Sequence, residues 1–156
     1  MKYEIKIDLK GLNKTLDEIQ DAVKQGTELG LKQVASEMKQ MEHDIIDINI
    51  GGDGSYVRTG KLKSSITIMP ITWSNGLAEI SVVPKGCNYA IYNELGTGIY
   101  ADDGRQDGWV YPLGNGEYRF TRGLPPKYFV RDTREFYSDK ASRFIEDNIK
   151  RLLNFN

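Results

Sequence analysis

The chain has very little histidine or cysteine, the two residue types on which many catalytic and metal sites depend. Of its 156 residues, only His43 is a histidine and only Cys87 is a cysteine. A single thiol excludes an internal disulfide, so nothing indicates oxidative folding, and a reducing compartment is expected. One histidine leaves a catalytic triad with one possible base, and one His with one Cys is too few for a closed zinc site. We therefore expect no catalytic residues, no metal and no cofactor.

The chain also lacks an excess of either charge and any long apolar run. Its 21 basic and 22 acidic residues give a formal net charge of -1, so no overall field attracts it to nucleic acid or to an anionic membrane. No run approaches the roughly 18 apolar residues of a membrane span. Residues 1–6 alternate charged side chains with bulky ones and lack the apolar stretch of a signal peptide. We expect neither membrane contact nor a leader.

A length of 156 residues with 39% apolar residues suits one domain with a modest core. No internal repeat divides it. Residues 2–9 alternate apolar with polar side chains, which predicts a strand. From residue 12 to residue 46, apolar residues and glycines follow one another by three or four positions, which predicts one long helix. These residues form a stripe along one helix face: Leu12, Leu16, Ile19, Val23, Gly26, Gly30, Val34, Met38, Met41 and Ile45.

The predicted helix over residues 12–46 is longer than a domain of this size. At about 1.5 Å per residue it spans about 50 Å, whereas the radius of gyration expected for the whole chain is near 15 Å. The helix must therefore bend or reach beyond its own core. Gly26 and Gly30 lie on the stripe itself, where they mark either a bend or another backbone packed close.

A glycine-rich loop from Gly51 to Gly60 precedes the region 64–122, in which we expect the sheet. Alternating apolar residues on both sides of Asn75-Gly76 predict a tight hairpin. Residues 89–95 predict a third strand, and residues 109–111 and 118–120 predict a second hairpin around Gly114-Asn115-Gly116. The polar stretch 102–108 predicts an exposed loop.

The last element expected is a helix over residues 132–153. Asp132 and Glu135 have the spacing of a capping pair, and Pro125-Pro126 forces an extended segment before them. Apolar residues recur from Tyr137 to Leu152 at helical spacing. The whole chain therefore predicts a single α+β domain, in which a small twisted antiparallel β-sheet packs against a long N-terminal helix and a C-terminal helix.

Two glycine motifs imitate nucleotide-binding loops and fail on their context. Residues 54–61 approach a P-loop, but five residues separate its glycines and Leu62 replaces the magnesium-binding hydroxyl. Gly96-Thr97-Gly98 fits the loose dinucleotide pattern, yet the acidic stretch beginning at Asp102 follows it instead of a helix. A sharp turn that needs two glycines explains this second motif better.

The charged residues offer weaker chemistry. Asp102, Asp103 and Asp107 lack the ligand order of a calcium hand. Glu94 lies in an apolar segment, where burial would demand an arginine or backbone donors, and acid-base chemistry there would require a second group. The stretch from Arg119 to Arg134 is locally basic, which leaves a small nucleic-acid-binding module as an alternative function.

Three segments together resemble the head-tail joining or minor tail proteins of long-tailed phages, a family often described as gene-product-ten-like. Residues 57–66 are similar to its Thr-Gly-x-Leu-x-x-Ser-Ile signature. Residues 89–98 are similar to its Tyr-Ala-x-Tyr-x-Glu-x-Gly-Thr segment, and residues 121–131 to its proline-rich approach to the last helix. The matched positions that we take as a candidate assembly motif are Arg58, Thr59, Gly60, Leu62, Ser65, Tyr89, Tyr92, Glu94, Gly96, Thr97, Gly98, Pro126, Phe129 and Arg131.

The resemblance implies a structural virion protein without catalytic activity, encoded by a phage or a prophage. It implies a ring of several copies in the neck or tail, assembled in the cytoplasm of the bacterial host. The partners implied are further copies of the chain, a head-side adaptor or connector protein, and a tail terminator or tail-tube protein. Contact with phage DNA in passing is compatible with this position. The two loops, 51–60 and 102–108, are expected to become ordered on assembly.

Overall fold

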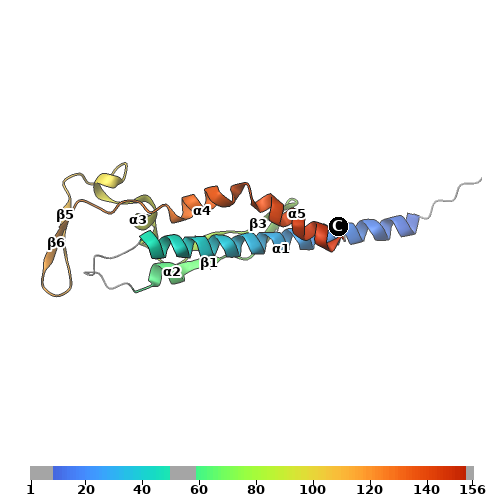
Figure 1. Ribbon diagram of the computed structural model, residues 1–156, viewed down its shortest axis with the longest axis horizontal. Helices are drawn as coiled ribbons and strands as arrows, with labels where there is room; N and C mark the ends of the chain where they lie inside the picture. Colours follow the sequence, from blue (N-terminus) through green and yellow to red (C-terminus); the bar gives the residue numbers. More distant parts are fainter. Residues whose placement is uncertain (1–8, 50–58, 154–156) are drawn as a thin grey trace, which may run out of the picture.

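One long helix, α1 (Leu9–Asn49), runs along the molecule and carries the other elements (Figure 1). The computed structural model describes residues 9–49 and 59–153. With 41 residues, α1 is about 60 Å long, and it confirms the helix predicted over residues 12–46. Leu9 begins this helix, so the predicted strand 2–9 is wrong at its last residue; its other residues lie outside the described ranges.

A short helix, α2 (Lys61–Ser65), leads into a ribbon of four short strands. These are β1 (Ile66–Ile68), β2 (Thr72–Ser74), β3 (Leu77–Glu79) and β4 (Val82–Pro84). The predicted hairpin around Asn75-Gly76 is confirmed: β2 pairs with β3, β1 pairs with β4, and both pairs are antiparallel. Asn75 and Gly76 have φ angles of 49° and 76°, as a turn of type I′ requires.

The segment predicted as a third strand is a helix, α3 (Ala90–Leu95), which corrects the prediction for residues 89–95. Helical geometry places Ala90 and Asn93, three residues apart, together in the interior, while Ile91 and Leu95 are exposed. An apolar run this short fits the strand period as well as the helix period. Tertiary contacts therefore decided its conformation.

A 3₁₀ turn, η1 (Gly98–Tyr100), leads to the second predicted hairpin, which is confirmed as β5 (Trp109–Pro112) and β6 (Tyr118–Thr121). This hairpin stands at one end of the molecule, away from the ribbon (Figure 1). Within residues 9–49 and 59–153, the strands form three two-stranded ladders, β1–β4, β2–β3 and β5–β6. The predicted α+β class is confirmed.

The closing helix predicted over residues 132–153 is two helices, α4 (Phe129–Ser138) and α5 (Ala141–Leu152). The chain leaves the α-helical pattern at Asp139 and Lys140, directly after Ser138. Serine and aspartate are poor helix formers because their side chains compete for backbone hydrogen bonds. The break gives α4 and α5 different directions, and both still pack on α1.

Gly26 and Gly30 mark a close approach of two helices, which resolves the two alternatives left by the sequence. A Cβ atom on Gly26 would lie 2.7 Å from the Cα of Ile149, and one on Gly30 would lie 2.5 Å from the Cα of Ile145. Real Cβ atoms essentially never come so near. The two glycines therefore allow α5 to lie directly on the backbone of α1.

The hydrophobic core lies where α1 meets α2, the ribbon, α3 and α4. Its buried side chains come from every one of these elements or from the turns beside them. They are Ala35, Ile46, Leu62, Ile66, Val82, Cys87, Ala90 and Phe129.

Candidate assembly site

The three segments that carry the family resemblance meet around the C-terminal half of α1. Leu62 and Ile66 come from the first segment, Ala90 from the second and Phe129 from the third, and all four share one core cluster with Ile46 of α1. Figure 1 shows α2, α3 and the start of α4 gathered at this end of α1. Residues far apart in the sequence are thus brought into one junction.

The first segment contributes buried residues to the core and contains the start of helix α2. Leu62 and Ser65 are buried, and the Ser65 hydroxyl donates to the carbonyl of Leu62 over 2.6 Å. Gly60 precedes α2 with a φ of 69°, and Thr59 is exposed beside it, its hydroxyl accepting from the N–H of Lys61. Arg58 lies outside the described residues.

The Gly96-Thr97-Gly98 turn fastens the second segment to the third. The N–H of Thr97 donates to the carbonyl of Leu124 over 2.9 Å, and the N–H of Leu124 donates to the Thr97 hydroxyl over 2.9 Å. Gly96 and Gly98 have φ angles of 79° and 61°. A Cβ on Gly96 would lie 2.9 Å from Cδ of Pro126. The predicted sharp turn that needs two glycines is therefore confirmed.

The Glu94 side chain is a polar link between the second and third segments. Its two carboxylate oxygens accept hydrogen bonds from the N–H groups of Val130 and Arg131, each over 2.9 Å. The first N–H groups of a helix have no partner within that helix, and a carboxylate also complements its dipole. Glu94 of α3 therefore caps α4, and backbone donors meet the need predicted for this side chain.

This cap replaces the one predicted from the sequence. The capping pair of Asp132 and Glu135 is wrong, because α4 begins at Phe129 and the Asp132 carboxylate instead accepts from the Arg131 guanidinium over 2.9 Å. A capping pattern in the sequence predicts only caps whose residues lie within a few positions of the helix start. Glu94 lies more than thirty residues before the helix that it caps, so no local spacing predicts its role.

The remaining motif residues divide between core and surface. Phe129 is fully buried, and the carbonyl of the half-buried Tyr89 accepts from the Asn93 side chain over 3.1 Å. Tyr92 is exposed. The Arg131 guanidinium lies 3.3 Å from the centre of the Tyr128 ring, a cation-π contact.

Glu42 of α1 is a buried carboxyl that sequence reasoning missed. Its side chain is fully buried, and neither of its oxygens makes a hydrogen bond. Burial raises the pKa of Glu42 to about 8, and the negative charge of Glu94 adds to this effect. At neutral pH the group is therefore mostly protonated. Glu42 lies four residues after Met38 and three before Ile45 of the predicted stripe, and this helical spacing was the sequence signal for its burial.

The β5–β6 hairpin exposes an apolar face. Val110 pairs with Phe120 and Pro112 pairs with Tyr118, so the four side chains lie on the same side of the ladder. Val110 is 58%, Phe120 57% and Tyr118 73% exposed. In the part of the chain that the structure describes, β5 and β6 pair only with each other. Apolar side chains and open strand edges thus occur together here.

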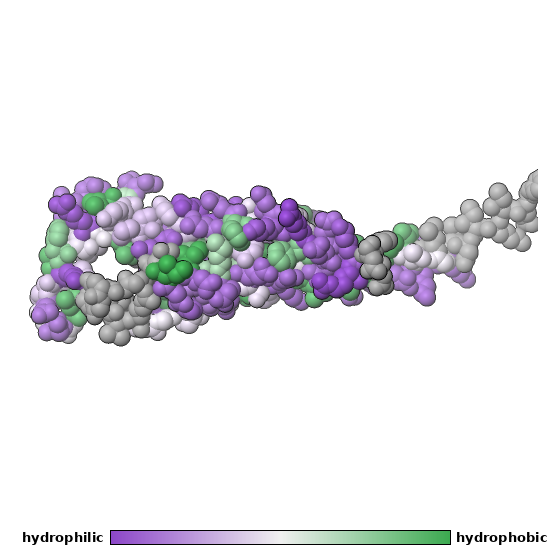
Figure 2. Space-filling model, viewed as in Figure 1, coloured by the Kyte–Doolittle hydropathy of each residue, from purple (hydrophilic) through white to green (hydrophobic). Residues whose placement is uncertain are grey.

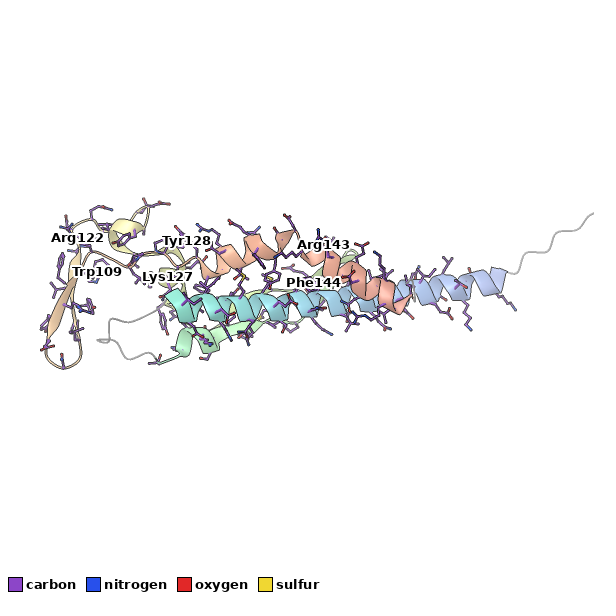
Figure 3. All side chains as sticks on the ribbon, viewed as in Figure 1. Trp109, Arg122, Lys127, Tyr128, Arg143 and Phe144 are labelled. Atoms are coloured by element: carbon purple, nitrogen blue, oxygen red, sulfur yellow. The ribbon has the colours of Figure 1, made fainter. Side chains whose placement is uncertain are left out.

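The basic residues predicted as a nucleic-acid surface extend from this hairpin to α4. In Figure 3, Arg122 lies near the hairpin together with Trp109, whereas Lys127 lies beside Tyr128 at the approach to α4. The guanidinium of Arg131 is matched locally by Asp132. Nucleic-acid binding by this stretch remains a prediction.

Other candidate groups make no cluster. Over residues 9–49 and 59–153, no group of three or more His, Cys, Asp or Glu side chains is placed to hold a metal ion. His43 is half-buried, and its pKa is lowered by burial and by the charges of Lys63 and Lys39. Among the described helices, none combines the length and apolar character that crossing a membrane needs.

Comparison with known proteins found no match to this chain. No protein-family model matches it, and neither a curated protein nor a solved structure does.

Proposed function

We propose that this protein is a structural virion component that joins or completes the head-tail connector or the tail of a long-tailed phage or prophage. Copies of the chain form a ring that contacts a head-side adaptor and a tail terminator or tail-tube protein. The ring is assembled in the cytoplasm of the host and stays in the particle. The junction of the three motif segments supports this proposal, because residues of all three resembling segments meet in one core cluster.

The single observation that carries the proposal is the exposed β5–β6 hairpin. An isolated two-stranded hairpin is marginally stable in water, and this one presents Val110, Phe120 and Tyr118 to solvent. An apolar face with two open strand edges is a surface suited to a protein partner. The turn at Gly98 anchors the base of the hairpin, since the N–H of Ile99 donates to the carbonyl of Arg122 over 3.0 Å.

The experiment replaces Val110 and Phe120 with serine in the phage or prophage genome that encodes the protein. We expect DNA-filled heads and finished tails to accumulate separately in electron micrographs, and the titre of infectious particles to fall at least a hundredfold. The exposed Lys85→Ser variant is the control and should leave particle yield unchanged. Circular dichroism of the purified double variant should show a helix content equal to that of the wild type.

Two results contradict the proposal. The first is a normal yield of infectious particles from the double variant. The second is the absence of the protein from purified wild-type virions in mass spectrometry. In a separate binding assay, DNA affinity that falls steeply with salt would favour the nucleic-acid-binding alternative.

A further inference from the structure

The N-terminal part of α1 carries an apolar stripe with the spacing of a coiled-coil seam. Leu12, Leu16, Ile19 and Val23 follow one another by four, three and four residues, and Gly26 and Gly30 continue the series. The positions beside this seam are neutral, since Thr15, Gln20 and Ala22 occupy them. The charged side chains of this part of α1 lie on its other faces.

Only the second half of this seam is covered by the described part of the chain. Ile149 lies on Gly26 and Ile145 lies on Gly30, and α5 ends at Leu152. Beyond this crossing, Leu16 is 48%, Ile19 41% and Val23 41% exposed. Figure 1 shows that α1 projects past α5, and Figure 2 shows apolar residues on the projecting part. The exposed stripe is therefore continuous with an interface that already joins two helices.

An apolar groove lies on the side of α5. It has a volume of about 570 Å³ and is lined by Ser142, Ile145, Glu146, Ile149, Lys150 and Leu153. The groove lies on one face of α5 and is largely open to solvent. Its two charged residues, Glu146 and Lys150, form an ion pair of 2.7 Å with each other. A side chain that fills the groove would therefore not bury an unpaired charge of Glu146 or Lys150.

We infer that the stripe of Leu16, Ile19 and Val23 on one copy of the chain fills the α5 groove of another copy. This inference rests on the proposed ring and names one of its contacts. The stripe and groove are different surfaces, so each copy would accept one neighbour and insert into the next, as a closed ring requires. A copy cannot fill its own groove with Leu16 and Ile19, because α5 is fixed on Gly26 and Gly30 of the same continuous helix.

The test is a cross-link between two differently sized copies. In a Cys87→Ala background, one copy carries Gln20→Cys beside the stripe and the other carries Glu146→Cys at the groove. After mixing and mild oxidation, we expect the mixed disulfide dimer to be at least tenfold more abundant than with Asp21→Cys, which lies on the opposite face of α1. The Leu16→Ser/Ile19→Ser variant should also reduce the assembled mass in analytical ultracentrifugation while keeping the wild-type melting temperature.

The same cross-link is then measured in purified particles, so that two failures can be told apart. Absence of the mixed disulfide, or equal cross-linking through Asp21→Cys, overturns the stripe-and-groove contact. If the protein is nevertheless found in virions, the proposed function stands and another surface forms the ring. If it is absent from virions, the proposed function fails independently of the cross-link.

Discussion

Two glutamates near the C-terminal half of α1 have different roles, although the charge of one acts on the other. Glu94 places its two oxygens on the first N–H groups of α4. Glu42 makes no hydrogen bond through its carboxyl oxygens and is fully buried. The charge of Glu94 helps to raise the pKa of Glu42. A carboxylate that caps a helix stabilises the fold, whereas a carboxyl buried without partners ties stability to pH.

Replacing Glu94 with alanine should destabilise the protein by about 1–2 kcal/mol, the typical cost of losing a helix cap. Unfolding in urea, followed by circular dichroism, measures this change. Glu79→Ala is the matched control, because Glu79 is exposed on β3 and its loss should change stability by less than about 0.5 kcal/mol. Equal effects from the two variants would contradict the capping role.

Stability should fall as the pH rises from about 5 to about 8, because of Glu42. The folded state holds a proton on this group up to a pKa of about 8, whereas the unfolded chain releases it near 4.5. The folded state therefore binds more protons over this range, and raising the pH favours unfolding. Glu42→Gln should remove much of this dependence of stability on pH. At pH 8 it should stabilise the protein by a few kcal/mol, because each unit by which the pKa is raised corresponds to about 1.4 kcal/mol.

Urea unfolding of the wild type and of Glu42→Gln at pH 5 and pH 8 provides the measurement. Glu79→Gln should keep the pH dependence of the wild type. If Glu42→Gln keeps the full slope as well, some other group carries it, and the buried carboxyl is not the source.

At the scale of the elements, α1 and α5 are held together by close packing rather than by ion pairs. The ion pairs of Lys14 with Glu18 and of Lys32 with Glu28 lie along one helix surface and are largely exposed, so each contributes little. The contact between α1 and α5 depends instead on two missing Cβ atoms, at Gly26 and Gly30. Close packing of this kind is sensitive to a single added carbon.

Gly30→Ala should therefore destabilise the protein by about 1–3 kcal/mol, as other overpacking substitutions do. The new Cβ would lie 2.5 Å from the Cα of Ile145, so α5 would have to move. Gly11→Ala in the same helix is the control: Gly11 is exposed, and alanine favours a helix by up to about 1 kcal/mol. Thermal unfolding of both variants measures the difference, and a gain in stability from Gly30→Ala would contradict the close approach.

At the scale of the whole molecule, the hairpin and the stripe proposed for assembly lie at opposite ends of α1. The β5–β6 hairpin stands at the C-terminal end of this helix, and the stripe around Ile19 lies towards its N-terminal end (Figure 1). The core cluster described between them includes no residue of the hairpin or of the stripe. The hairpin and the stripe can therefore be altered without changing the core cluster, whereas Ile145 and Ile149 of the α5 groove also pack on α1.

Hydrogen exchange should show this division in the purified protein. Amides of β5 and β6 should exchange much faster than those of residues 34–46 in α1, because a two-stranded ladder opens easily whereas the core helix opens only with the domain. In assembled particles, the hairpin amides should slow by at least tenfold. Mass spectrometry of peptides covering residues 108–123 measures the change, and equal rates in free and assembled protein would place the contacts elsewhere.

Local patterns in the sequence determined the elements whose signals are long or chemically specific. The long helix, the Asn75-Gly76 turn, the second hairpin and the α+β class follow from periodicity and turn chemistry, which act between near neighbours. Tertiary structure decided the rest. Residues 89–95 became a helix and Glu94 became the cap of α4 because of contacts between distant segments. Helical spacing places Glu42 beside the predicted stripe, but its complete burial depends on elements that meet only in the folded molecule.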